Sequence, residues 1–194
     1  MINILYKAIF SPLEVFNRDN VKGRLKAACF TVIITALLGS VIAPLINFYN
    51  FKDRYEINLD ISGMLTRLVM SIATWLLVCA SFLLLSKAFG KEIRFEQIAS
   101  TWGISYIPNF LCVILYNLLL IKPEINNGSG FAAFIISTVF IMLLVWKAIF
   151  YFMLMRFVIN TTLCEITIIT VVSAVVFVIV IMIGSKVGIQ VPML

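Results

Sequence analysis

The stretch "FGKEIRFEQIASTWGISYIPNFL", from Phe89 to Leu111, joins a short charged segment directly to a long apolar run. Charged and amide side chains crowd its first part, and no charge follows Glu96 until Lys122. At about 1.5 Å rise per residue, a helix of that length crosses the roughly 30 Å hydrocarbon core of a bilayer. The stretch therefore predicts a turn at a membrane surface followed by a membrane-spanning helix.

The rest of the chain repeats this pattern of long apolar runs between charged turns. Of its 194 residues 62% are hydrophobic and 12% are charged, whereas soluble proteins carry about 25% charged residues. The apolar runs are continuous, so they predict helices and not the alternating strands of a barrel. We predict an all-α polytopic bundle (27–194) that follows a short interfacial N-terminal segment (1–26). Its five transmembrane helices are expected at 27–49, 66–88, 98–121, 131–155 and 166–186.

The distribution of basic residues predicts how the bundle is oriented. On the side of the N-terminus we place nine of them: Lys7, Arg18, Lys22, Arg24, Lys26, Lys87, Lys91, Arg94 and Arg156. On the other side we place five: Lys52, Arg54, Arg67, Lys122 and Lys186. The positive-inside rule then puts the N-terminus in the cytoplasm and the C-terminus outside. Because the charges stand at helix ends, we expect anionic lipids, and not nucleic acid, to contact them.

Two short motifs predict helix starts beside the charged turns. In "SPLE", Ser11 precedes a proline and stands three residues before Glu14, as in a capping box. In "TLCE", Thr162 and Glu165 have the same spacing just before the fifth span. The apolar and charged residues around the first motif predict one or two short helices that lie in the membrane interface.

The residue types that usually carry catalysis or bind metals are scarce in this chain. It contains no histidine, which excludes the histidine-based nucleophile arrangements. Its four cysteines, at positions 29, 79, 112 and 164, form no C-x-x-C pair, so a zinc site is not expected. No pair of carboxylates falls inside a span. We therefore predict a protein that is not an enzyme and has no cofactor or metal.

Lys147 is a charge well inside a predicted span, in "LLVWKAIFYF". Placing a charge at that depth costs at least about 2.5–3.5 kcal/mol, which marks the residue as a functional candidate. Two interpretations stay open: the side chain extends toward the inner boundary, or it faces the bundle and meets a polar partner. We group Lys147 with Tyr106, Asn109 and Arg67 as a candidate intramembrane polar site.

Two prolines interrupt the apolar runs. Pro44 and Pro108 each remove an amide donor, so we expect a kink in the first and in the third span. Polar residues gather around Pro108, as a cavity or pathway would require, although many packed bundles contain the same feature. Small residues four apart, as in Ala99 and Gly103, form faces that allow close helix contact.

Several of these residues together resemble the Yip family of five-span membrane proteins, which are named in eukaryotes for interacting with Rab GTPases. The resemblance rests on the "SPLEVF" segment and on the stretch from Phe89 to Pro108. The matching residues are Pro12, Phe16, Gly90, Phe95, Tyr106 and Pro108. It implies a helical bundle that acts in membrane organisation, trafficking or transport support, without catalytic residues. Because this sequence lacks a long cytoplasmic N-terminal domain, we expect a bacterial member that does not bind Rab proteins.

We therefore expect an integral membrane scaffold or accessory subunit that contacts lipids and other membrane proteins or a second copy of itself. The alternative is a small transporter or channel with a pathway along the kinked third helix and Lys147. An intramembrane enzyme is the third hypothesis, and the missing histidines and paired carboxylates weigh against it.

Overall fold

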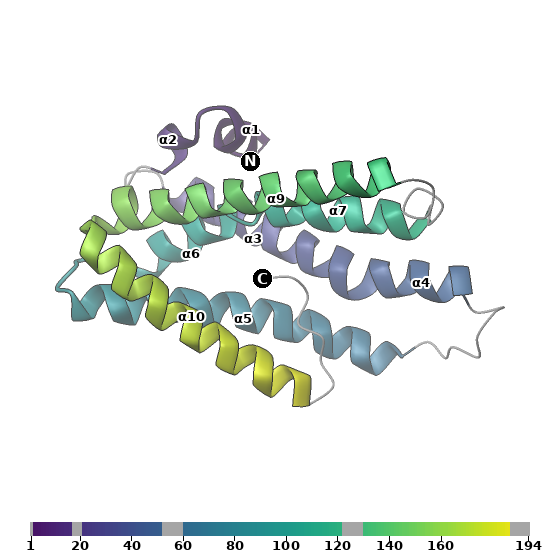
Figure 1. Ribbon diagram of the computed structural model, residues 1–194. Helices are drawn as coiled ribbons and strands as arrows, with labels where there is room; N and C mark the ends of the chain where they lie inside the picture. The colour runs from purple at the N-terminus through teal and green to yellow at the C-terminus, as the bar shows by residue number, and fades with distance from the viewer. Residues whose placement is uncertain (1, 17–20, 52–59, 122–129, 187–194) are drawn as a thin grey trace.

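The computed structural model describes residues 2–16, 21–51, 60–121 and 130–186, which are helical apart from short turns and contain no strand. Figure 1 shows long helices running side by side, with two short N-terminal helices on one flank. In chain order the elements are α1 (Ile2–Phe10), α2 (Pro12–Val15), α3 (Val21–Leu37), η1 (Leu38–Ile42), α4 (Ala43–Phe51), α5 (Ile61–Ala88), α6 (Phe95–Ile104), α7 (Ile107–Ile121), α9 (Gly130–Met153), η2 (Leu154–Ile159) and α10 (Leu163–Lys186).

Four helical stretches in the described part of the chain are long and apolar enough to cross a membrane. They are Arg24–Asn50, Ile61–Ala88, Phe95–Ile121 and Ala133–Ile159, and they overlap the first four predicted spans. The chain is thus an all-helical, multi-pass membrane protein. The fifth predicted span falls in α10, which carries a shorter apolar helix over Leu163–Val175, so the count of five stays a prediction. The predicted outer-loop charges at 52–56 and 122–124 lie outside the described residues.

At Pro44 the first span changes its helical type instead of ending. The π-helical turn η1 comes directly before α4, and the amide of Ala43 donates to the carbonyl of Leu38 five residues back. In a regular helix the proline ring would clash with the carbonyl of Ser40, and the wider π turn relieves that crowding.

At Pro108 the third span is broken, and the break lies two residues before the proline. Helix α6 ends at Ile104 and α7 begins at Ile107, with Ser105 and Tyr106 in the turn between them. The amide of Tyr106 donates to Gly103 over 3.2 Å. The hydroxyl of Ser105 donates to the Trp102 carbonyl over 2.7 Å, so these polar groups are satisfied within the turn.

The buried core lies toward one end of the bundle, which we call the Lys91 end. It contains the turn at residues 89–94 and the turn at residues 160–162. The buried side chains come from α3, from the second half of α5, from α6 and from η2, and Phe82, Ile98 and Leu154 are among them. At the opposite end, which we call the Asp60 end, large apolar side chains are exposed on α5, α9 and α10. Packing against protein is therefore concentrated in one half of the molecule.

The most extensive helix pairing in this core joins α3 to α6. A Cβ atom added to Gly103 would lie 2.5 Å from the Cβ of Ala28 and 3.0 Å from its Cα. Real side chains do not approach so closely, so glycine at this position permits the contact. The small-residue face predicted on the third span is therefore used for close packing.

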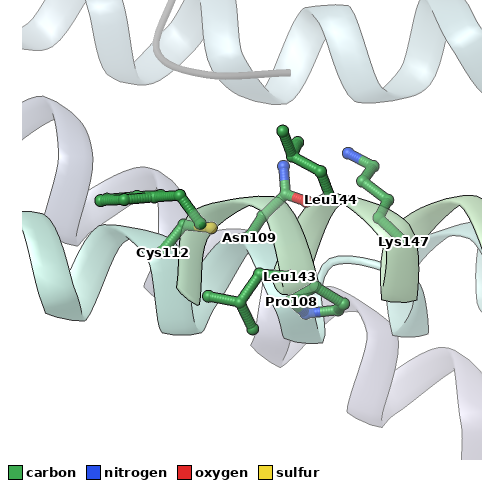
Figure 2. Close-up of a pocket in the computed structure, with 7 residues that line it drawn as sticks. Pro108, Asn109, Cys112, Leu143, Leu144 and Lys147 are labelled. Atoms are coloured by element: carbon green, nitrogen blue, oxygen red, sulfur yellow. The ribbon is translucent and has the colours of Figure 1, made fainter. Parts of the chain in front are cut away.

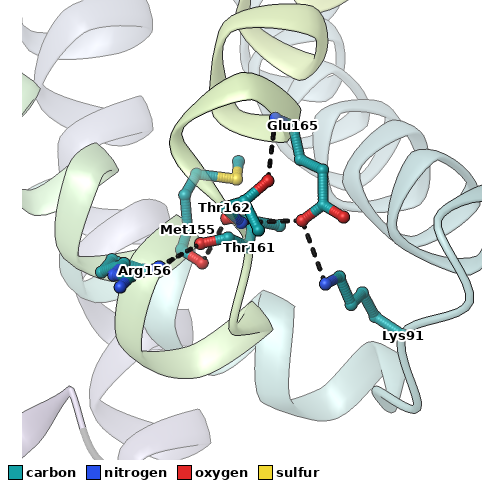
Figure 3. A network of polar contacts seen from close by, with 6 residues as sticks. All are labelled: Lys91, Met155, Arg156, Thr161, Thr162 and Glu165. Carbon is teal, nitrogen blue, oxygen red and sulfur yellow. Dashed lines mark hydrogen bonds and ion pairs between the residues drawn. The ribbon is translucent and has the colours of Figure 1, made fainter.

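A polar network fastens the start of α10 at the Lys91 end (Figure 3). The amide of Thr162 donates to Glu165 Oε2 over 2.7 Å, and the amide of Glu165 faces Thr162 Oγ1 at 3.4 Å. The predicted capping box is thus confirmed. The same Oε2 pairs with Lys91 Nζ at 3.0 Å. The Thr162 amide first, and the Lys91 ammonium next, hold the pKa of the Glu165 carboxyl below its ordinary value.

The capping box predicted at Ser11 and Glu14 is wrong. The side chain of Ser11 makes no cap hydrogen bond, because its backbone carbonyl already accepts from the Glu14 amide over 3.0 Å. Glu14 pairs instead with Lys7, at 3.0 Å between Oε2 and Nζ. The ion pair therefore joins α2 to α1.

Candidate functional site

Lys147 lies in α9 with its ammonium over two aromatic rings. Nζ is 5.3 Å from the ring centroid of Trp102 and 4.8 Å from that of Tyr106. A cation within about 6 Å of a ring face is attracted to it by roughly 0.5–2 kcal/mol. The side chain therefore faces α6 and the turn that follows it. The ammonium contacts the faces of these two rings, so the side chain is directed into the bundle.

The two rings belong to a larger aromatic cluster formed by Phe82, Trp102, Tyr106 and Tyr151. Trp102 stands at its centre, with ring centroids 5.2 Å from Phe82, 6.2 Å from Tyr106 and 6.3 Å from Tyr151. All three pairs are nearly perpendicular, which is a favoured arrangement for aromatic rings. The hydroxyl of Tyr151 lies 2.8 Å from that of Thr170, which links the cluster to α10.

Beside Lys147, α7 and α9 enclose a groove of about 250 Å³ (Figure 2). The residues on each helix follow helical spacing, so each helix contributes a single face to the groove. Its lining contains Pro108, Asn109, Cys112, Phe140, Leu143, Leu144 and Lys147. Figure 2 shows the Asn109 amide and the Lys147 ammonium extending to the same side of the two helices. The groove is thus mostly apolar and carries one amide, one thiol and one cation.

The structure brings together three of the four residues predicted for the polar site. Lys147 contacts Tyr106 and shares the groove with Asn109. Arg67 does not line this groove. It lies near the start of α5, where its Nε donates to the carbonyl of Gly63 over 3.0 Å. Of the two kink prolines, Pro108 lines the groove, whereas Pro44 lies at the start of α4 and does not.

Trp102 and Tyr151 belong to the site but were not predicted from the sequence. A usable signal existed, since Trp102 stands four residues before Tyr106 and Tyr151 stands four residues after Lys147. Residues at that spacing share a helix face. The contribution of Phe82 has no such signal, because nothing in its local sequence relates α5 to α6.

The cluster and groove can hold a charge, but they do not assemble a recognisable reaction centre. Within the residues that the structure describes, no three potential metal ligands come together. The Cys112 thiol in the groove is buried and unpaired with any other cysteine. The chain has no histidine that could activate it as a base.

Comparison with known proteins identifies one match. A family model described as the Yip1 domain matches residues 6–185, which is nearly the whole chain. No curated protein and no solved structure gave a significant match.

Proposed function

The chain belongs to the Yip1 family, and from this premise we propose a non-enzymatic scaffold or accessory subunit for membrane organisation, trafficking or transport. Its partners would be membrane lipids and other membrane proteins, or a second copy of the chain. In this proposal five helices span a bacterial inner or plasma membrane, with the N-terminus in the cytoplasm and the C-terminus outside. The segment 1–26 would lie along the inner surface.

The observation that carries the proposal is the uneven burial of the helices. In the most apolar part of Ala133–Ile159 only 6% of the residues are buried, against 50% in Phe95–Ile121. Toward the Asp60 end, Ile141 is 60% exposed and Val178 is 54% exposed. Lipid covers such surface in a bundle that works alone, and the helices of a neighbouring subunit cover it in a complex. Such surface suits a subunit that packs against neighbouring helices.

Extraction in lipid-containing polymer discs tests this role without removing weakly bound neighbours. We expect discs of fixed protein stoichiometry that contain a second membrane protein or a second copy of the chain. Ile141→Trp and Val178→Trp should lower the fraction recovered as a complex. The matched control is Phe157→Trp, at a position that is 50% exposed at the Lys91 end. Recovery of a monomer surrounded only by lipid, in the wild type, would refute the proposal.

A transporter or channel is the second candidate, favoured by the break in the third span beside the groove. Against it, most of the groove lining is apolar and the Lys147 ammonium is held on ring faces. Flux of small ions and metabolites into vesicles that contain the purified protein separates the two roles. We expect no flux above that of protein-free vesicles, and flux abolished by Lys147→Met would establish transport instead.

A further inference from the structure

We propose that the groove between α7 and α9 binds an unesterified fatty acid, with its carboxylate on the Lys147 ammonium and its chain along the apolar lining. The inference goes beyond the scaffold role and does not depend on it. It rests on the composition of the groove, on the charge balance around Lys147 and on the depth of that residue in the span.

The shape and lining of the groove suit a slender apolar molecule with one polar end. Its volume of about 250 Å³ lies just below the range of about 300–1,000 Å³ that is usual for small-molecule sites. Phe140, Leu143 and Leu144 line it from α9, and Pro108 lines it from α7. A single acyl chain meets these requirements, whereas a two-chain lipid would fill more space than the groove offers.

The charge at Lys147 selects an anion with a single negative charge. No acidic side chain in the described part of the chain forms an ion pair with Lys147. The rings of Trp102 and Tyr106 attract the ammonium but do not neutralise it. A carboxylate would neutralise it with one charge. A phosphate monoester would bring surplus negative charge into the apolar groove.

The depth of Lys147 restricts which anions can reach it. The residue lies twelve positions before Ile159 in the span Ala133–Ile159, which is about 18 Å of helix. A phosphodiester headgroup keeps its charge and therefore stays at the interface. A fatty acid can enter the membrane as the neutral acid and release its proton to the aqueous phase, because the Lys147 ammonium stabilises the carboxylate that remains. The position of the cation therefore favours a fatty acid over a phospholipid.

Fluorescence quenching measures this binding directly, because Trp102 lies beside the proposed carboxylate site. The probes are a bromine-labelled fatty acid of about ten carbons and its methyl ester, added to the protein in lipid nanodiscs. We expect saturable quenching by the acid and only the linear quenching of membrane partition by the ester. Lys147→Met should weaken acid binding about tenfold or more, since a charge-assisted contact is lost. Lys147→Arg should retain most of the affinity.

Two controls separate binding in the groove from general effects of the substitution. Lys87→Met removes an exposed lysine at the end of α5 and should leave quenching unchanged. Photolabelling of the wild type with a diazirine fatty acid, mapped by mass spectrometry, should mark α7 and α9 even if a variant folds poorly. Equal quenching by acid and ester in wild type and Lys147→Met would overturn the proposal. So would Lys147-dependent binding of a model helix with a central glutamate, if the fatty acid failed to bind.

Discussion

Gly103 determines how closely α3 and α6 approach each other in the core. The space beside it is occupied by Ala28, whose Cβ would lie 2.5 Å from an added methyl group. The neighbouring atoms include the Ala28 backbone, which cannot rotate away as a long side chain could. Adding a single methyl group at this point would therefore force the two helices apart.

We predict that Gly103→Ala lowers the free energy of unfolding by about 1–3 kcal/mol, because overpacking strains the contact. Chemical denaturation in detergent micelles measures the change. Ala28→Gly alone should cost up to about 1 kcal/mol through lost helix propensity. The double variant should recover part of the loss at Gly103, because it restores the space for a methyl group. Costs that simply add would show that the two residues do not interact.

The close contact was only partly predictable from sequence. The four-residue spacing of Ala99 and Gly103 indicates a smooth helix face, and the structure uses that face. Spacing does not say which helix packs against it, because Ala28 lies in a different span and shares no local pattern with Gly103. The same limit applies to Lys147, whose aromatic partners come from another helix.

At the scale of a single helix, the start of α10 depends on Glu165. Its carboxylate accepts from the Thr162 amide and pairs with Lys91, so it joins the cap of one helix to the turn before another. Both contacts favour the ionised carboxylate and hold its pKa below the ordinary value of 4.5. The stabilisation is therefore present above that ordinary value and is lost as the pH falls through the pKa of the folded state.

We predict that Glu165→Gln removes a part of the acid-induced loss of stability. Thermal unfolding between about pH 6 and pH 3 measures this loss. The variant should be less stable than the wild type at the upper pH, and its stability should fall less as the pH is lowered. Glu14→Gln, which deletes a carboxylate of a different ion pair, serves as the control. An unchanged pH profile in Glu165→Gln would show that the network does not contribute to stability.

The helices themselves were more predictable than the interruptions within them. In lipid, a long continuous apolar run can satisfy its backbone hydrogen-bonding groups only as a helix. The four spans therefore follow from composition and charge placement. Pro44 and Pro108 predicted interruptions of the regular α-helix. A proline alone does not determine whether the interruption is a π turn or a break in the helix. Ser105 and Tyr106 make hydrogen bonds within the turn before Pro108. The segment before Pro44 has fewer polar side chains that could do the same.

For the whole molecule, the predicted orientation places the Lys91 end in the cytoplasm and the Asp60 end outside. Cys164 is exposed at the first end, whereas Cys79 and Cys112 are buried and Cys29 is half-buried. Ser62 is exposed near the other end, in the first turn of α5. These two positions allow both surfaces to be tested in one chain.

We predict that a membrane-impermeant maleimide labels Cys164 in inverted membrane vesicles and leaves it unlabelled in intact cells. Cys164→Ser should abolish that labelling. Adding Ser62→Cys to this variant should restore labelling, now from the outside of intact cells. The opposite pattern at both positions would reverse the orientation, and labelling of both from the same side would contradict the three spans placed between them.

The polar contacts described above for α10 lie in its first part, and this has a consequence for how the protein responds to its membrane. The ion pair with Lys91, the hydrogen bond between the Thr170 and Tyr151 hydroxyls and the buried residue Ile169 all lie in the first part of α10. Val178 and Ile179, further along the helix, are exposed. A helix held in this way changes its tilt at little cost when the hydrocarbon thickness changes. In a thinner bilayer α10 would lean over, while the core at its fixed end keeps its packing.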